Sequence, residues 1–361
     1  GRVKMVDWLA GNRVRGTSAE RTTSAGFNDV AAISGGWVEL GRTTLGSANA
    51  TIDVTSLADK RYLMMLCTST GQSAGANTGS QFNADTGSSY STRRSNNGGA
   101  DYTDINFSDM EAASTGTTPY FQVAYASNLA SKEKLLQSWL IAQTTAGAGT
   151  APFRNESVGK WANTSNAVSS YQWITSTSAT FDSGSEVVVL GWDPADTHTT
   201  NFWEELASVE LGVAGNDLSS GTISAKKYLW VQAYAKATGG NINNGFRFNS
   251  DTGSNYANRR SVDGATDATQ INTSSACDDA NLDSAYERFY NMFIVNNSSN
   301  EKLSICHVVQ QNASGAANAP RRGEYVGKWA NTSNQITDIT LHNFSGGNLD
   351  TGSIIKVWGS D

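Results

Sequence analysis

The sequence is poor in cysteine, proline and charge. Of its 361 residues only 3 are Cys and 4 are Pro, and charged residues make up 16%. Lys and Arg are scattered without a basic block and the formal net charge is −7, which argues against a nucleic-acid partner. No apolar run approaches the length of a membrane-spanning helix, which argues against a membrane partner.

The few cysteines and histidines form no metal-binding or disulfide pattern. Cys67, Cys277 and Cys306 are odd in number and lack metal-ligand spacing, and the three His are far apart in the chain. We therefore expect no cofactor. Structural calcium stays open, because three stretches are acidic although none is an EF-hand loop: 278–283, Asp101 to Asp104, and Asp182 with Glu186.

The first residues do not form a cleavable signal. Residues 1–16 contain no apolar stretch of signal length and no small-residue cleavage site. Gly1 is the residue that remains when an initiator Met is trimmed. We expect a protein made in the cytosol and not secreted through a cleaved signal, although a processed precursor begins in the same way.

Glycine, small polar residues and aromatics are abundant instead. The chain has 35 Gly, and its 10 Trp, 12 Tyr and 12 Phe supply enough large apolar surface for compact cores, which excludes disorder over most of the length. Short runs rich in Val, Leu, Tyr and Trp, such as 61–68 and 185–192, are bounded by Gly, Asn, Asp and Ser. This pattern predicts β-strands joined by polar turns.

The sequence contains two related segments. FNADTGSSYSTRRS at 82–95 recurs as FNSDTGSNYANRRS at 248–261, with 10 of 14 positions identical at an offset of 166. APFRNESVGKWANTSN at 151–166 recurs as APRRGEYVGKWANTSN at 319–334, with 13 of 16 identical at an offset of 168. The offsets differ by only two residues, so the two copies are collinear and the chain contains an internal repeat.

The repeat predicts the domain organisation. We expect an N-terminal arm at 1–34, a first copy at 35–193, a linker at 194–200 and a second copy at 201–361. Each copy has several short strands and no alternating helices, which predicts an all-β fold. The fold class is two tandem homologous antiparallel β-sandwich domains of jelly-roll type, with a closed barrel as the nearest alternative.

The arm has no counterpart in the second copy. Val3, Val6 and Leu9 fall on one face of a short amphipathic helix, and Trp8 adds a large apolar side chain to an otherwise polar segment. One interpretation is a frayed terminus. The other is an assembly arm that reaches onto a neighbouring subunit, because these side chains need an apolar partner; removing the arm then changes the oligomeric state.

The tetrapeptide Asp-Thr-Gly-Ser occurs once in each copy. Aspartic proteases place one such Asp in each of two related lobes, where two carboxylates share a proton. Here Asp-Thr-Gly follows Phe-Asn-Ala or Phe-Asn-Ser and is followed by Tyr and two Arg. These flanking residues do not fit those enzymes. Asp-Thr-Gly also forms an ordinary turn, with Gly supplying positive φ. We interpret Asp85, Gly87, Asp251 and Gly253 as duplicated structural turns and expect no catalytic residues.

The segment VGKWANTSN is identical in both copies. Trp161 with Asn163, and Trp329 with Asn331, form a candidate glycan platform, in which the indole stacks on a sugar ring and the amide bonds to its hydroxyls. The competing interpretation has the two Trp packed as core or edge anchors, with Asn-Thr-Ser-Asn forming the turn into the next strand. Both interpretations are non-enzymatic.

The opening VDWLAGNRVRGTSAERT, together with FNxDTGSxYxxRRS, EKL and APxRxExVGKWANTSN, resembles uncharacterised structural proteins, of capsid-decoration or tail type, from tailed viruses of bacteria and archaea. The resemblance covers nearly the whole chain. It implies a virion component made in the host cytoplasm, on the capsid surface or in the tail or its fibres. It also implies assembly with copies of itself, a trimer being favoured, and with other virion proteins, and it implies no catalytic residues.

Three non-enzymatic functions therefore follow from the sequence. The first is a virion structural protein that assembles as a homo-oligomer. The second is a lectin-like, receptor-binding module whose partner is a host-surface glycan. The third is a subunit of an extracellular filament or a surface layer on the cell.

Overall fold

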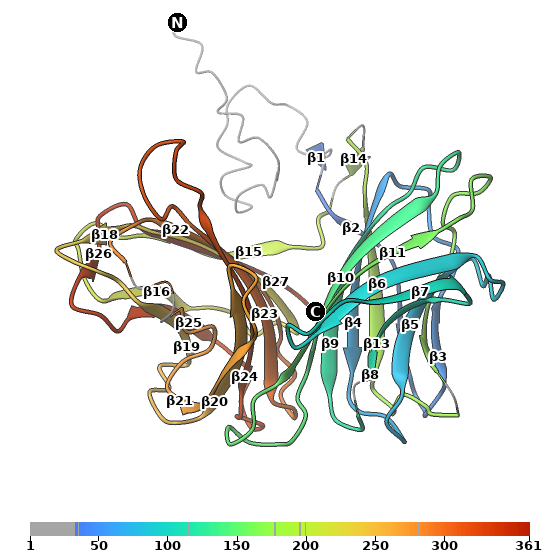
Figure 1. Ribbon diagram of the computed structural model, residues 1–361, viewed down its shortest axis with the longest axis horizontal. Helices are drawn as coiled ribbons and strands as arrows, with labels where there is room; N and C mark the ends of the chain where they lie inside the picture. Colours follow the sequence, from blue (N-terminus) through green and yellow to red (C-terminus); the bar gives the residue numbers. More distant parts are fainter. Residues whose placement is uncertain are drawn as a thin grey trace, which may run out of the picture.

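The computed structural model describes residues 33–361 except 35, 115, 177, 195, 199, 280, 281 and 283. Strands make up the regular structure of this part of the chain, which contains no α-helix and thus no helix that could cross a membrane. The predicted all-β fold is confirmed. Two β-sandwiches lie side by side, one built from each half of the chain (Figure 1).

The first half folds into two antiparallel sheets. The larger sheet has eight strands, in the order β2 (Val38–Thr44), β13 (Glu186–Trp192), β4 (Tyr62–Ser69), β9 (Tyr120–Ser127), β10 (Lys134–Ala142), β11 (Phe153–Trp161), β6 (Tyr90–Asn96) and β7 (Tyr102–Phe107). The smaller sheet has the order β3 (Thr51–Val54), β12 (Tyr171–Thr175), β5 (Asn77–Phe82) and β8 (Met110–Ser114). The chain crosses repeatedly between the sheets, as it does in jelly rolls.

The second half has the same strand order. Its larger sheet runs β15 (Glu204–Glu210), β27 (Ile354–Ser360), β17 (Tyr228–Ala235), β22 (Arg288–Val295), β23 (Lys302–Gln310), β24 (Arg321–Trp329), β20 (Tyr256–Val262) and β21 (Ala268–Thr273). Its smaller sheet runs β16 (Asp217–Thr222), β25 (Asp338–Asn343) and β19 (Asn244–Phe248). Two short pairs complete the fold: β18 (Ala237–Thr238) with β26 (Asn348–Leu349), and β1 (Ile33–Ser34) with β14 (Thr197–His198).

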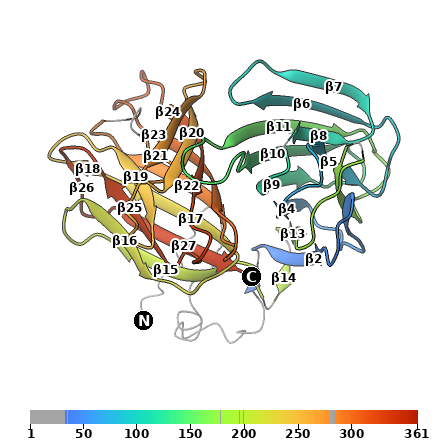
Figure 2. The same ribbon diagram turned by 90° about the horizontal axis from the view of Figure 1, so that it is seen from below.

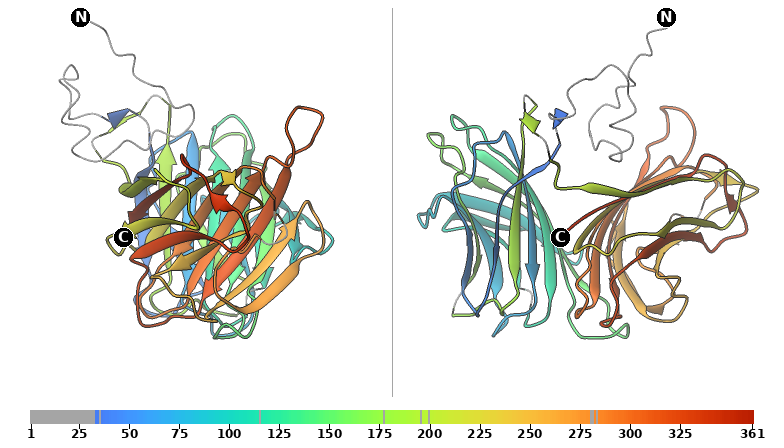
Figure 3. Two further views of the ribbon diagram at one scale, coloured as in Figure 1. Left: turned by 90° about the vertical axis from the view of Figure 1, so that its left-hand side faces the viewer. Right: turned by 180° about the vertical axis from the view of Figure 1, so that it is seen from behind.

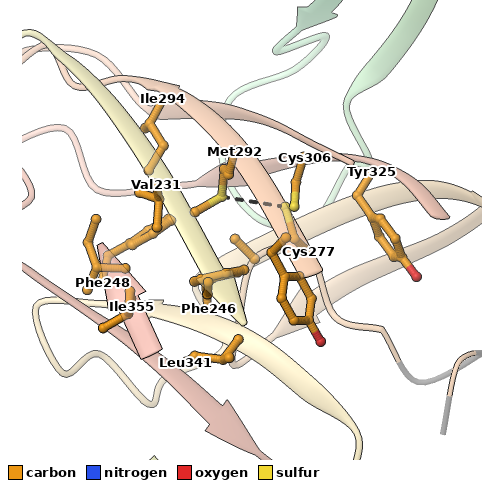
Figure 4. Close-up of a cluster of buried hydrophobic side chains, with 14 of the residues drawn as sticks. Val231, Phe246, Phe248, Cys277, Met292, Ile294, Cys306, Tyr325, Leu341 and Ile355 are labelled. Carbon is orange, nitrogen blue, oxygen red and sulfur yellow. Dashed lines mark hydrogen bonds between the residues drawn. The ribbon is translucent and has the colours of Figure 1, made fainter. Parts of the chain in front are cut away.

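Each sandwich encloses its own apolar core. Alternate side chains of the strands point between its two sheets, as the period of two requires. In the second half, Phe246 and Leu341 of the smaller sheet pack against Val231, Met292 and Cys306 of the larger one (Figure 4). All three cysteines of the chain are buried free thiols.

A third apolar core joins the two halves. It is formed by the outer faces of the two larger sheets, which face each other so that the smaller sheets lie on the outside (Figures 1 and 3). Phe121 and Ile141 contribute from the first half, and Trp230, Phe293 and Ile305 from the second. The sequence predicted two sandwiches in tandem but gave no sign that their larger sheets pack on each other.

The candidate arm residues lie outside the described part of the chain: Val3, Val6, Trp8 and Leu9. The boundary of the first copy at residue 35 lies close to β1. Within the predicted linker, Thr197 and His198 pair with Ser34 and Ile33, so the segment before the first sandwich and the segment between the sandwiches form a two-stranded ribbon.

Candidate functional site: the duplicated motifs and the face between the sandwiches

In each half, the Asp-Thr-Gly-Ser turn and the VGKWANTSN segment are bound to each other. Asp85 accepts a hydrogen bond from the backbone N–H of Gly87 at 2.8 Å and from the indole N–H of Trp161 at 2.7 Å. Asp251 makes the same two contacts, at 2.8 Å with Gly253 and 2.7 Å with Trp329. The most similar segments of the two halves are therefore one structural unit, in which each carboxylate satisfies a buried indole.

This geometry agrees with the predicted turns and not with a protease dyad. Burial acts to raise the pKa of Asp85, but the hydrogen bonds from Trp161 and Gly87 outweigh it and hold that pKa below its usual value. The pKa of Asp251 is lowered in the same way. A proton-sharing pair has one raised pKa, because two like charges in contact cannot both ionise. Each carboxylate serves the Trp of its own half instead.

One detail of the predicted turns is wrong. Gly87 and Gly253 are not the residues with positive φ. The left-handed conformation occurs just before the Asp, at Ala84 with φ of 51° and Ser250 with φ of 55°, each preceded by an Asn that is also left-handed. Asn side chains tolerate this region, so the pair Asn-Ala or Asn-Ser makes the tight turn and the glycine only avoids crowding the Asp.

The candidate glycan platform is wrong because its two indoles are buried. Trp161 and Trp329 are each 1% exposed, and Trp161 stacks on Tyr90 at a ring distance of 6.3 Å. Neither face of the indole is open to a sugar. Asn163 and Asn331 are turn residues, each accepting two backbone N–H bonds at 2.8–2.9 Å from the residues two and three positions later. The structure agrees with the other interpretation, in which the two Trp are packed anchors and the two Asn form turns.

Sequence reasoning missed two buried lysines. Lys134 and Lys302 are fully buried beneath the Trp of their own half, with the ammonium nitrogen 5.3 Å from the Trp161 ring and 5.8 Å from the Trp329 ring. Each donates to the carbonyl of the turn asparagine, Asn163 at 3.0 Å or Asn331 at 2.8 Å. Burial lowers the pKa of Lys302 to about 8. The signal that could have found them is the tripeptide Glu-Lys-Leu, which occurs at the same place in both copies.

The two larger sheets contact each other through different ends of their outer faces. We call one end of the outer face the loop end, which carries Ile141 and Arg154 in the first half and Val309 and Arg322 in the second. We call the other the lysine end, which carries Leu135 and Lys160 in the first half and Leu303 and Lys328 in the second. The loop end of the first half covers the lysine end of the second, as burial of their side chains shows.

The rim of this contact is charged. Arg154 binds Asp267 of the second half at 2.6 Å and lies 3.3 Å from Glu324, with 6% of its side chain exposed. Beyond the apolar centre, Lys227 binds Glu186 at 2.9 Å. A buried ion pair is costly to break, since removing one partner leaves the other charged and desolvated. These pairs therefore fix how one sandwich sits on the other.

A polar group lies near the middle of the contact. His307 packs edge-on against Trp139 at a ring distance of 4.9 Å, beside Arg154 and Glu156. Burial, and secondarily the positive charge of Arg154, lowers the pKa of His307 to about 4. These side chains close on one another and leave no space for even a water molecule. The group is a contact between the two halves.

In each acidic stretch considered for calcium, at least one carboxylate pairs with a cation of the chain itself. Asp101 pairs with Arg93 at 3.2 Å, and Glu186 with Lys227. Asp279 pairs with Arg288 at 3.3 Å, both fully buried. In the part of the chain that the structure describes, no group of three or more His, Cys, Asp or Glu is arranged to hold a metal ion.

Comparisons with known proteins show little likeness. No protein-family model matches the chain and no curated protein matches it. Solved structures with some likeness include domains LG4-5 of the mouse laminin α1 chain (9% identity, 90% of this chain and 91% of that one, TM-score 0.18). The flagellar hook junction protein FlgK from Burkholderia pseudomallei (9%, 76% and 42%, TM-score 0.11) and an outer membrane channel from Pseudomonas putida F1 (8%, 80% and 97%, TM-score 0.12) are further examples. At these TM-scores none carries an argument about this chain.

Proposed function

We propose that this chain is a non-enzymatic structural protein of a virion, which assembles as a homo-oligomer on the capsid surface or in the tail or its fibres. One part of the support is chemical. The residues that resembled a reactive site, Asp85 and Asp251, and those that resembled a sugar platform, Trp161 and Trp329, all serve to build the two sandwiches.

The observation that carries the assembly role is an exposed apolar edge. Among the residues that the structure describes, strand β7 pairs with β6 alone, and it lies at the outer edge of the first larger sheet (Figure 2). Tyr102, Ile105 and Phe107 of this strand are exposed, Ile105 at 72%. Monomeric proteins protect such edges with charge, proline or a covering segment, because an open edge pairs with other chains. An edge with three large apolar side chains fits a subunit that is covered in an assembly.

The proposed position in a virion rests on the motifs that resemble those of virion proteins, and it has a direct test. Antibodies raised against the purified chain are used for immunogold labelling of virus particles and of cells, separated from a culture that expresses the gene. We expect gold on the particles, at the capsid or along the tail. Gold confined to the cell envelope or to filaments would instead support the surface-layer or filament function and refute the proposal.

The self-assembly half of the proposal is tested on the purified chain. Light scattering coupled to size exclusion gives the mass of the full chain over a range of concentrations. We expect a defined multiple of 38.3 kDa. The Trp8→Asp variant tests the arm: a change of mass supports an arm that reaches a neighbour, whereas an unchanged oligomer supports the frayed terminus.

A further inference from the structure

Burial runs in opposite directions along two equivalent strands. On β10 the outward side chains become less exposed from Leu135, at 59%, to Ile141, which is fully buried. On β23, the equivalent strand, they become more exposed from Leu303, at 1%, to Val309, at 44%. The same apolar positions are therefore covered in one half and open in the other.

The neighbouring strands β11 and β24 repeat the inversion with charged side chains. Arg154 is buried against the second half, while its equivalent Arg322 keeps 63% of its side chain exposed. Lys328 is buried at the contact, while its equivalent Lys160 keeps 46% exposed. The lysine end of the first half and the loop end of the second are thus both open, and they are the counterparts of the two surfaces that meet within the chain.

The loop that makes the internal contact has a free copy of the same shape. Residues 143–152 join β10 to β11, and Lys328 donates from the second half to the carbonyls of Gln143 at 3.1 Å and Thr145 at 2.5 Å. Residues 311–320 join β23 to β24 and are exposed almost throughout. Both loops have left-handed residues at the same places: φ is 65° at Thr144 and 66° at Asn312, and 87° at Gly147 and Gly315.

The acidic partner of the internal contact is also present twice. Asp267, just before β21, binds Arg154, and its equivalent Asp101, just before β7, lies at the open surface with 50% of its side chain exposed. The backbone N–H of Asn272 on β21 donates to the 143–152 loop at 2.9 Å. The equivalent strand β7 is the edge described above, and most of its side chains are exposed.

From these counterparts we infer that the loop end of the second half binds the lysine end of the first half of another copy of this chain. In this contact Arg322 meets Asp101 of the neighbouring molecule, and Lys160 of that molecule meets carbonyls of the 311–320 loop. The inference rests on the proposed function, which requires a homo-oligomer, and names the surface that makes it. The contact joins two different surfaces, so repetition closes a ring or extends a filament.

The free loop is already in the conformation that the internal contact uses, so binding requires little ordering of its backbone. The intermolecular contact is nevertheless weaker than the internal one. The position of Glu186, which binds Lys227, is occupied by Ile354 in the second half, so that ion pair has no counterpart. Gln137 also replaces the buried Ile305 at the centre of the open lysine end.

The experiment uses the full chain and two single substitutions at open positions. Leu135→Asp places a charge on the lysine end of the first half, and Val309→Asp places one on the loop end of the second. Val213→Asp is the matched control, because Val213 is 80% exposed in the loop between β15 and β16 and belongs to neither surface. Circular dichroism and thermal unfolding establish that each variant is folded. Sedimentation velocity then gives the mass.

We expect the wild type and V213D to form the same oligomer, and L135D and V309D each to sediment as a 38.3 kDa monomer. An equimolar mixture of the two monomeric variants is the decisive sample. Each retains the surface that the other lacks, so the mixture forms a dimer of twice that mass and stops there. A contact between two identical surfaces gives no such rescue.

Three results would overturn the inference. An oligomer that survives both substitutions shows that self-assembly uses another surface, and leaves the proposed function standing. A mixture of L135D and V309D that stays monomeric shows that the contact does not join these two surfaces. A wild type that remains a monomer at all concentrations refutes this contact and the homo-oligomer together, while the immunogold result decides separately whether the protein belongs to a virion.

Discussion

The imidazole of His307 reports directly on whether the two sandwiches stay in contact in solution. It packs against Trp139 of the other half, and burial lowers its pKa from 6.5 to about 4. The folded protein therefore keeps His307 neutral between pH 6.5 and pH 4, where the unfolded chain binds a proton. Because the unfolded state then binds more protons, the free energy of unfolding decreases as the pH falls through this range.

The size of this effect follows from the two pKa values. A difference of about 2.5 in pKa at about 1.4 kcal/mol per unit gives a limiting loss of about 3.5 kcal/mol, of which about 3 kcal/mol falls between pH 7.5 and pH 4. Two buried carboxylates act in the opposite sense, since burial raises the pKa of Asp109 and of Asp279 to about 6. The informative quantity is therefore the difference between the wild type and His307→Gln, which removes only the imidazole.

Two measurements test the prediction. Urea unfolding at intervals from pH 7.5 to pH 4 gives the difference in the free energy of unfolding between the wild type and H307Q. We expect this difference to shift by about 3 kcal/mol across the range, in favour of H307Q at low pH. NMR titration of the His307 ring gives its pKa directly. His342→Gln is the control, because His342 lies in the second half on β25, away from the contact.

A single result would refute the reasoning. If the His307 ring titrates near 6.5 and H307Q shows the same acid dependence as the wild type, the imidazole is in water and the two larger sheets do not pack as described. A pKa between 4 and 6.5 would mean that the charges of Arg154 and Glu156, which lie beside the ring, offset part of the effect of burial.

Equivalent residues of the two halves supply the remaining predictions, each measured by urea unfolding at pH 7. Arg154→Ala leaves the buried Asp267 without its partner and is expected to cost about 3–5 kcal/mol. Arg322 is exposed within one molecule, so at protein concentrations too low for assembly Arg322→Ala changes the free energy of unfolding by less than about 0.5 kcal/mol. Asp85→Ala removes the acceptor of the Trp161 indole and is expected to cost about 1–3 kcal/mol. Equal losses for R154A and R322A, or no loss for D85A, would contradict these assignments.

Much of the fold could be predicted from the sequence because it depends on local signals. Apolar runs such as 61–68 and 185–192 predict strands, and the collinear repeat predicts two sandwiches. The interpretation of Trp161 as a packed anchor agrees with the structure, in which its indole is buried. Three features needed the fold itself: the pairing of Asp85 with Trp161, the burial of Lys134 beneath that indole, and the third core.

The third core could not be predicted because both halves carry the same strand pattern there. Leu135 and Leu303 stand at equivalent positions in similar strands, yet one is open and the other is buried. A hydrophobic pattern states which side chains need a partner and not which partner they receive. Ile141 is covered by the second half, whereas its equivalent Val309 is 44% exposed. Only the order of the halves in space separates the two cases.

On the outer faces of the two larger sheets, equivalent positions carry different residues where one half is covered and the other is open. At the lysine end the covered position holds Ile305 and the open one Gln137; farther along the face the covered position holds Val123 and the partly open one Asn291. The internal contact thus has the more apolar residues at these positions, while its open counterparts carry polar substitutions there. This composition suits the proposed contact between copies, in which repetition supplies several weak contacts at once. The mixture of L135D and V309D tests whether the two open surfaces bind in this way.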